Sequence, residues 1–518
     1  MSDLITGTFK FLGKFAQKAL LYIYAGRLDI RKGTGFLHML LTGNAGSNTG
    51  ARFLSENEQL KILSPSNQGL LVDGKSKRLS LEESFKHLLI VAPTGTGKTS
   101  KFVIPNVLAL AQNENSIIIT DPSGEIFSQT SGYMQSKGFK VLKFDPTDPE
   151  HSIYFNPLRY IFTYGTDSTG RTSTTKIDPV KVSLLATSLV ASSLKSPQDS
   201  FWKAGAESLV EFFTYCLKDT PRDYHNLYNV YKLAEAMTPE GNLLDNFMVN
   251  YAHEQSLKDK WLSLIGNSNP TTQSHIATTQ TALKPLANER LAKILSKNTI
   301  RFSDLKKEKT ILYLTFPVNE ASFYTFILNL FYTLLFHSYM EAIPKKEDLP
   351  LFILYDEFGH ANIPDFDIII TNMRKYKVSL SLVLQSFSQL ETQYGQEKAN
   401  TIIEGGINSK LFFSGTSQKT AQAIEKMLGK VIRQETYHTD RNEQITNRSE
   451  YNLLNADEIR TLPDNQAFFL TGNKSPILLD VLPYFQNSKF KNKPNFGEAH
   501  IPANNYHKYE LQNILDEV

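Results

Sequence analysis

Cysteine is almost absent from this chain of 518 residues, which contains Cys216 and no other. A single thiol excludes an internal disulfide framework and is typical of proteins from a reducing compartment. Cys216 lies in the apolar run 210–217. This setting favours a small buried side chain over a reactive thiol.

An excess of one charge sign is also missing. The net charge is +3, with 21% charged and 41% hydrophobic residues, which is the composition of a globular protein. Residues 178–300 hold twelve Lys or Arg and twelve Asp or Glu. The composition therefore gives no electrostatic indication of nucleic-acid binding.

No secretory signal, internal repeat or coiled-coil heptad pattern is visible. Residues 321–340 lack Asp, Glu, Lys and Arg and are long enough to cross a bilayer. They lie, however, between two strand patterns, at 310–317 and 351–356. Crossing there would put strands of one sheet on opposite sides of a membrane, so we expect a buried helix of an α/β domain.

The first 49 residues form an amphipathic, basic segment. Lys10, Lys14 and Lys18 recur every four residues among aromatic and aliphatic residues over 8–25, and residues 1–35 contain six Lys or Arg against two Asp or Glu. A helix of this kind lies on a membrane surface or packs on a partner protein. Both interpretations remain open.

The most informative stretch is residues 87–99. The apolar run 88–91 is followed by Ala92, Pro93, Thr94, Gly95, Thr96, Gly97, Lys98 and Thr99. A strand, a glycine-rich turn and a helix start form a phosphate-binding loop, in which the lysine reaches the β- and γ-phosphates and the hydroxyl binds Mg²⁺. Ala92 stands where glycine is common, and it is small enough for the backbone to approach a phosphate. We therefore expect ATP and Mg²⁺ to bind here.

Strand and helix patterns alternate around this loop. Apolar runs at 116–121 and 140–145 suit parallel strands buried on both faces. The rhythm stops over 161–300, where helical spacing dominates, and it resumes with strand patterns from 310 to 482. We predict an α/β nucleotide-binding domain in two parts (50–160 and 301–485), an inserted all-α domain (161–300) and a poorly ordered tail (486–518).

A strand pattern at 351–355 ends in two carboxylates, Asp356 and Glu357. Ligands of open parallel sheets bind at the carboxyl ends of the strands. We expect Asp356 to join Thr99 in the Mg²⁺ shell and Glu357 to polarise the attacking water. Helix capping is the alternative role for such a pair.

These residues carry a family resemblance, which runs from about residue 50 to 485. The chain resembles the type IV secretion coupling proteins, the TraG/TraD family of conjugative DNA-transfer ATPases. The matching segments are 92–99, 121–125, 144–146, 156–158, 201–206, 356–359, 374–376, 384–389 and 453–459. The resemblance implies a RecA-like P-loop NTPase core with an inserted all-α domain, assembled as a homo-hexamer around a channel.

The resemblance also implies roles for single residues. Gln385 would sense the γ-phosphate, and Arg374 would act as an arginine finger on a neighbouring subunit's nucleotide. Asp121 would support the metal or the water, or cap the loop that follows its strand. Ser123 stands where the family usually has lysine, and the two membrane-spanning helices with which members usually begin are not seen.

By this resemblance, the chain is an ATP-driven coupling protein that recruits relaxase-bound single-stranded DNA or a protein substrate. It would deliver the substrate to the inner-membrane channel components of a type IV secretion system. We expect a cytoplasmic protein, peripheral at the bacterial inner membrane. The alternatives are a double-stranded DNA translocase of the FtsK/HerA kind and a receptor that uses nucleotide only as a switch.

Overall fold

The computed structural model describes residues 49–166, 172–191, 200–238, 242–266, 270–438 and 444–517. The chain divides into two compact units. The larger comprises residues 52–428 and 454–518, and the smaller comprises residues 1–51 and 429–453. The basic segment 8–25 lies outside the described residues.

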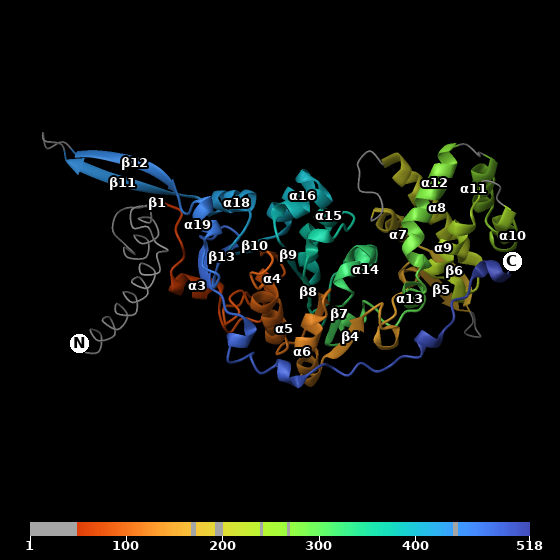
Figure 1. Ribbon diagram of the computed structural model, residues 1–518, viewed down its shortest axis with the longest axis horizontal. Helices are drawn as coiled ribbons and strands as arrows, with labels where there is room; N and C mark the ends of the chain where they lie inside the picture. Colours follow the sequence, from red (N-terminus) through yellow and green to blue (C-terminus); the bar gives the residue numbers. More distant parts are fainter. Residues whose placement is uncertain are drawn as a thin grey trace. The chain divides into compact units, whose positions relative to one another are not determined.

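A nine-stranded sheet forms the centre of the larger unit (Figure 1), in the order β14-β13-β10-β2-β9-β8-β3-β7-β4. The seven strands from β10 to β4 are parallel. Beyond β10, β13 pairs antiparallel to β10, and the edge strand β14 pairs antiparallel to β13. The predicted strand positions are confirmed. The strands are β2 (Leu88–Val91), β3 (Ser116–Thr120), β4 (Lys140–Phe144), β7 (Thr310–Leu314), β8 (Leu351–Tyr355), β9 (Val378–Leu384), β10 (Ser409–Phe413), β13 (Gln466–Thr471) and β14 (Ile477–Asp480).

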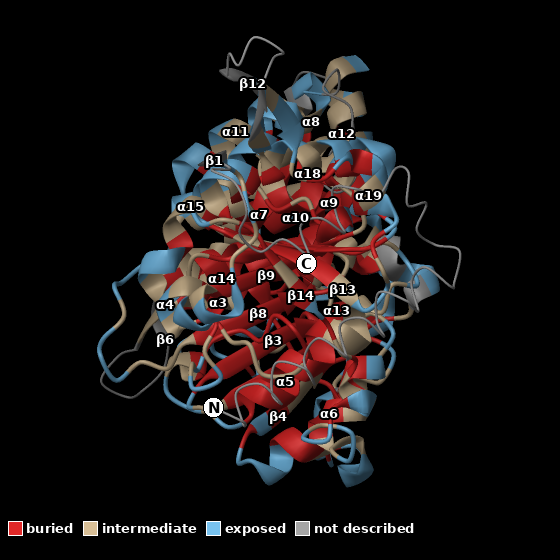
Figure 2. Cartoon of the chain, turned by 90° about the vertical axis from the view of Figure 1, so that its left-hand side faces the viewer, coloured by how far each residue is buried: buried red, intermediate tan, exposed pale blue. Residues whose placement is uncertain are grey.

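Helices are interspersed with these strands along the chain. Those outside the insert are α3 (Glu56–Ile62), α4 (Leu81–Ser84), α5 (Ile104–Leu110), α6 (Glu125–Ser136), α14 (Ala321–Met340), α15 (Phe366–Met373), α16 (Phe387–Tyr394), α17 (Gln396–Asn400), α18 (Gln418–Leu428) and α19 (Ala456–Arg460). The central strands are buried, whereas much of the outer helical surface is exposed (Figure 2). Burial on both faces explains why the strands read as continuous apolar runs.

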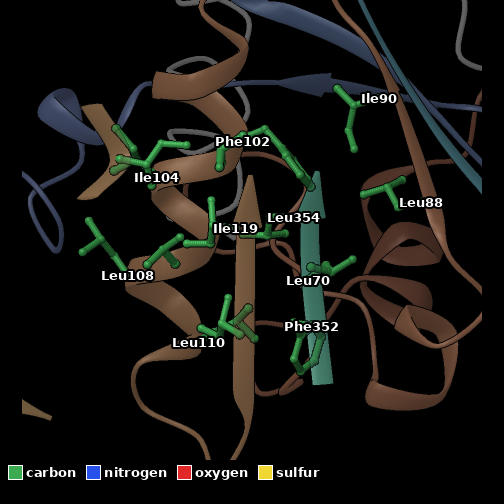
Figure 3. Packing of buried hydrophobic residues seen from close by; sticks show 14 of the residues in the cluster. Leu70, Leu88, Ile90, Phe102, Ile104, Leu108, Leu110, Ile119, Phe352 and Leu354 are labelled. Carbon is green, nitrogen blue, oxygen red and sulfur yellow. The ribbon is translucent and has the colours of Figure 1, made fainter. Parts of the chain in front are cut away.

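One face of the sheet packs against α5 and α6. Figure 3 shows Phe102, Ile104 and Leu108 lying next to Ile119 and Leu354, and all five side chains are buried. Burying each such side chain stabilises the fold by roughly 1.5–3 kcal/mol. This packing holds rigid the helix that follows the predicted phosphate loop.

The opposite face packs against α14. The Tyr332 hydroxyl lies 2.8 Å from the Thr120 hydroxyl, and the Tyr332 ring lies 4.8 Å from the Tyr355 ring. The helix α14 also contacts α7 (Pro179–Ala191), where the Ser188 hydroxyl donates to the Thr333 hydroxyl over 3.4 Å. The helix at 321–340 is thus buried inside the α/β domain as predicted. Among the described residues, no helix is long and apolar enough to cross a membrane.

The insert is mostly helical. Besides α7 it contains α8 (Ser200–Cys216), α9 (Leu227–Ala236), α10 (Asn242–Tyr251), α11 (Gln255–Gly266), α12 (Pro270–Leu283) and α13 (Glu289–Ile294). Cys216 is buried, and burial raises the pKa of its thiol. The prediction of an all-α insert missed an antiparallel hairpin of β5 (Phe162–Thr166) and β6 (Thr172–Ile177). These strands contain five threonines and one glycine among eleven residues, and β6 has a single apolar residue, so no strand pattern of useful length marks the hairpin.

The smaller unit corrects the predicted domain boundary at 301–485. Its described part is a sheet of β1 (Thr49–Gly50), β11 (Lys430–His438) and β12 (Gln444–Asn452), in which β12 pairs along its whole length with β11. Residues 429–453 are therefore not part of the nucleotide-binding core. These strands carry few apolar residues and are unsuited to the interior of a parallel sheet.

The C-terminal residues 486–517 pack on other parts of the larger unit, so the prediction of a poorly ordered tail was wrong. The Phe496 ring lies 5.3 Å from the Tyr133 ring, and the Ala499 N–H donates to the Ser131 hydroxyl over 2.9 Å. Further on, Ile514 is fully buried, and its N–H donates to the Asn229 side chain over 2.9 Å. The polar composition concealed these separate anchors, which have no helical or strand period.

Candidate active site

The carboxyl ends of four central strands lie next to one another. The strands β2, β9, β8 and β3 are consecutive neighbours, and they end at Val91, Leu384, Tyr355 and Thr120. The residues that follow directly are Ala92, Gln385, Asp356 and Asp121. The carboxyl ends of parallel strands are where such sheets bind ligands. Four of the predicted site positions thus lie side by side, although the first and last of them, 92 and 385, are more than 290 residues apart in the sequence.

The predicted phosphate loop connects β2 to a helical turn that begins at Thr99. Gly95 and Gly97 have φ of 84° and 80°, in the left-handed region that glycine adopts without strain. The Ala92 N–H donates to the Leu384 carbonyl over 2.8 Å, which fixes the start of the loop to β9. The loop therefore has the backbone that an anion-binding turn requires.

Lys98 lies between the two acidic residues that follow β8, Asp356 and Glu357. Its Nζ is 3.1 Å from Asp356 Oδ1 and 3.1 Å from Glu357 Oε1. The Thr99 hydroxyl donates to Asp356 Oδ2 over 3.4 Å. The side chain of Lys98 is only 15% exposed, so these charges interact in a partly dehydrated environment. The structure brings together all four of these predicted residues.

Glu357 has an unusual backbone. Its φ is 63° and its ψ is 42°, and it is one of four described residues other than glycine with positive φ. A left-handed conformation costs a side-chain-bearing residue about 1–2 kcal/mol. Such strain is found often at functional sites, where the surrounding fold holds it in place.

Asp121 and Asp356 are both buried acids. Burial raises the pKa of Asp121 to about 6, with the charge of Asp356 adding to the effect. Burial also raises the pKa of Asp356, and Lys98 opposes that shift. Asp121 Oδ2 accepts a hydrogen bond from the Phe127 N–H over 2.8 Å at the start of α6. Asp121 thus makes the loop-capping contact and also lies near the paired acids.

Gln385 and Arg374 occupy opposite edges of the sheet. Gln385 follows β9 beside the phosphate loop, and its backbone N–H donates to Gln389 Oε1 over 2.8 Å. Arg374 is exposed and precedes β9, in the turn Arg374–Tyr376. Since β9 spans seven residues, the two edges are roughly 20 Å apart. Arg374 therefore does not join the phosphate loop of its own chain.

Oxygen ligands suited to Mg²⁺ are present at the site. Thr99 Oγ1 and Asp356 Oδ2 are in contact, and Mg²⁺ prefers one or two protein oxygens completed by phosphates and waters. Within the described ranges, no group of three or more His, Cys, Asp or Glu residues could hold a metal ion. The donor set fits a magnesium ion that shares its shell with a nucleotide, and it does not fit a cage made by protein alone.

One residue beside the loop was not selected from the sequence. Lys101 Nζ donates to the Thr96 carbonyl over 2.5 Å and to the Asp464 carbonyl over 2.8 Å. Asp464 lies 363 positions further along the chain. A lysine in the first turn after such a loop has no sequence signal of its own, because the distant partner is a backbone carbonyl.

The family model for type IV secretory system conjugative DNA transfer matches residues 49–504. The chain belongs to this family. The match covers the nine-stranded sheet and the insert, so the family relationship applies to both the candidate site and the helical region.

Individual members of the conjugative DNA transfer family are distant in sequence. Protein VirD4 of Rhizobium radiobacter is 24% identical over 457 residues, which cover 83% of this chain and 62% of the relative. Conjugal transfer protein TraG of the same organism is 22% identical over 418 residues, or 77% and 62% of the two chains. The chain thus spans about three-fifths of the length of these curated relatives.

Solved structures of the family share the fold. The bacterial conjugative coupling protein TrwBdeltaN70, in its unbound monoclinic form, has a TM-score of 0.67 at 16% identity and covers 86% of this chain and 97% of its own. TrwB in complex with ADP and Mg²⁺ has a TM-score of 0.66 at 17% identity, with coverage of 88% and 99%. The predicted RecA-like fold with an inserted helical domain is confirmed.

Proposed function

We propose that the chain is the ATP-driven coupling protein of a type IV secretion system. The observation that carries this proposal is the convergence of Lys98, Asp356 and Glu357 beside a loop of anion-binding backbone, with 3.1 Å from Lys98 Nζ to each carboxylate. A lysine for phosphate, a carboxylate for the metal and a second carboxylate for water are the groups that ATP hydrolysis needs.

Each residue has a distinct task in this proposal. The loop 92–99 binds the phosphates, and Thr99 and Asp356 hold a Mg²⁺ ion that would neutralise phosphate charge. Glu357 orients and polarises the attacking water, Gln385 senses the γ-phosphate, and Asp121 supports the metal or the water. Structures of TrwB with ADP and Mg²⁺ and with a non-hydrolysable ATP analogue support this reading by similarity of fold.

The assembly follows from the position of Arg374. Because this arginine lies at the edge opposite the loop, it can complete only the site of another subunit, as an arginine finger does. Head-to-tail contacts form a ring when the rotation between neighbouring subunits closes, and the family resemblance implies a ring of six. We therefore propose a homo-hexamer in which each active site lies between two chains.

The transported cargo is a relaxase-bound single strand or a protein, delivered to inner-membrane channel components of the secretion system. The family match and the similarity to VirD4 and TraG support this task. The segment 8–25, outside the described residues, would contact the membrane surface or a partner.

Steady-state ATP hydrolysis by the full chain tests the proposal, without DNA and with single-stranded or duplex DNA. We expect turnover that single-stranded DNA stimulates. Glu357→Gln should bind ATP and lose hydrolysis by a factor of about 100 or more, whereas Lys98→Ala should lose both. The exposed Lys474→Ala serves as a matched control for the loss of a lysine.

The alternatives give different results in the same measurements. Stimulation by duplex DNA alone would favour a double-stranded DNA translocase. Nucleotide binding without turnover in any condition would favour a receptor that uses nucleotide as a switch. If wild-type chain binds no nucleotide, the proposed function is wrong.

A further inference from the structure

Lys101 occupies a position from which it can control the shape of the phosphate loop. Its side chain is half-buried and bends back over the loop, so that a Cβ added at Gly97 would lie 3.3 Å from Lys101 Cε. Nζ donates to the carbonyls of Thr96 and Asp464, over 2.5 and 2.8 Å. Burial lowers the pKa of this ammonium group, while the nearby charge of Asp464 opposes the shift.

The bond to Thr96 determines the direction of a neighbouring donor. A peptide unit is planar and trans, so the carbonyl of one residue and the N–H of the next point in opposite directions. When Lys101 holds the Thr96 carbonyl, the Gly97 N–H is directed away from Lys101. A phosphate-binding loop needs its amides turned towards the anion and its carbonyls turned away from it. Lys101 provides a partner for one of these outward carbonyls.

The bond to Asp464 extends the contact to a second loop. Asp464 lies between α19 and β13, and its carboxylate accepts a hydrogen bond from the Ser414 hydroxyl over 3.1 Å. Gly415, which follows Ser414 in the sequence, donates its N–H to the Arg460 carbonyl at the end of α19 over 3.2 Å. Through Lys101, the phosphate loop is therefore joined to the turn 461–465 and to α19.

We propose that Lys101 is a positioning residue that pre-forms the phosphate loop and couples its occupancy to the turn 461–465. The proposal deepens the proposed function and rests on it. Since Nζ donates to the carbonyls of Thr96 and Asp464, Lys101 acts on the shape of the loop and is not assigned as a phosphate ligand. Its effect appears in nucleotide affinity and in the protection of a distant turn.

The test compares Lys101→Met, Lys101→Arg and Lys474→Met in the full chain. Methionine keeps the long apolar stem and removes the donors, whereas arginine keeps a charged donor that reaches two carbonyls. Lys474 is exposed on the loop after β13 and is the matched control. The binding of ADP with Mg²⁺ is measured by calorimetry, and amide hydrogen exchange is followed in 93–100 and 461–466 with and without ADP.

We expect Lys101→Met to raise the Kd for ADP about tenfold, as the loss of a half-buried charged hydrogen bond does. Exchange in 93–100 should be faster without nucleotide, and ADP should no longer protect 461–466. Lys101→Arg should restore most of the affinity and the protection. In the ATPase assay, KM should rise much more than kcat falls, which a general loss of folded chain would not produce.

Two results would overturn the inference while the proposed function stands. One is a Lys101→Met chain that binds ADP within twofold of wild type. The other, which needs no variant, is a wild-type chain that binds ADP but gains no protection in 461–466. A wild-type chain that binds no nucleotide would instead remove the proposed function.

Discussion

Lys98 and Glu357 form an ion pair of 3.1 Å between Nζ and Oε1, although they are 259 positions apart in the sequence. The pair joins the loop after β2 to the end of β8, two strands that are separated by β9. Glu357 makes this pair from a left-handed backbone, with φ of 63°. The site thus combines charge pairing with local strain.

Removing the Glu357 side chain should separate these two contributions. Both Glu357→Ala and Glu357→Gly lose the carboxylate, but only alanine keeps the strain of positive φ. We expect the free energy of unfolding, measured by urea denaturation, to be about 1 kcal/mol higher for the glycine variant than for the alanine variant. The exposed Gln422 of α18 is the control position. There the order should be reversed, with Gln422→Ala more stable than Gln422→Gly by about 1 kcal/mol. The same order at both positions would contradict the strain.

Arg374 should act in trans. Arg374→Ala is expected to bind ATP with unchanged affinity and to lose turnover by a factor of about 1000. In a one-to-one mixture with Lys98→Ala, roughly a quarter of the subunit interfaces combine an intact loop with an intact arginine, if chains mix at random. The mixture should regain turnover in that proportion. The control Lys375→Ala removes the neighbouring exposed cation and should keep its turnover without any mixing. If the mixture of Arg374→Ala and Lys98→Ala regains no activity, the trans role is excluded.

The acid Asp121 predicts a pH-dependent stability. Its pKa is raised from 3.8 to about 6 by burial, so the folded chain holds this proton more tightly than the unfolded chain. The resulting stabilisation is complete below about pH 4 and is lost as pH rises to 6, by up to roughly 3 kcal/mol. Asp121→Asn should flatten the unfolding free energy over this range. The exposed Glu347→Gln should leave the slope unchanged, and an equal slope in Asp121→Asn would contradict the prediction.

The C-terminal segment should contribute to stability. Ile514 is fully buried, and Ile514→Ala is expected to lower the free energy of unfolding by about 2–4 kcal/mol. Val249 is 75% exposed, and Val249→Ala should change it by less than about 0.5 kcal/mol. Equal small effects in thermal or urea unfolding would mean that the segment does not pack.

Much of the fold could be predicted because parallel strands buried on both faces need apolar residues at successive positions. The runs at 88–91, 116–120 and 351–355 meet this need, and each lies within a strand of the sheet. The hairpin of β11 and β12 carries no such pattern, because most of its paired residues are polar. The anchors of the C-terminal segment were missed for the same reason.

The candidate site shows the same division between local and distant information. The sequence by itself determined which residues can bind phosphate and metal, because the glycines, Lys98 and Thr99 must be neighbours to form the loop. Only the tertiary structure decided that Asp121, Asp356 and Gln385 lie at the same strand edge, that Arg374 lies at the opposite edge, and that Lys101 contacts Asp464. The order of the strands and the position of the Asp464 carbonyl depend on packing between segments hundreds of residues apart, so no local sequence pattern predicts them.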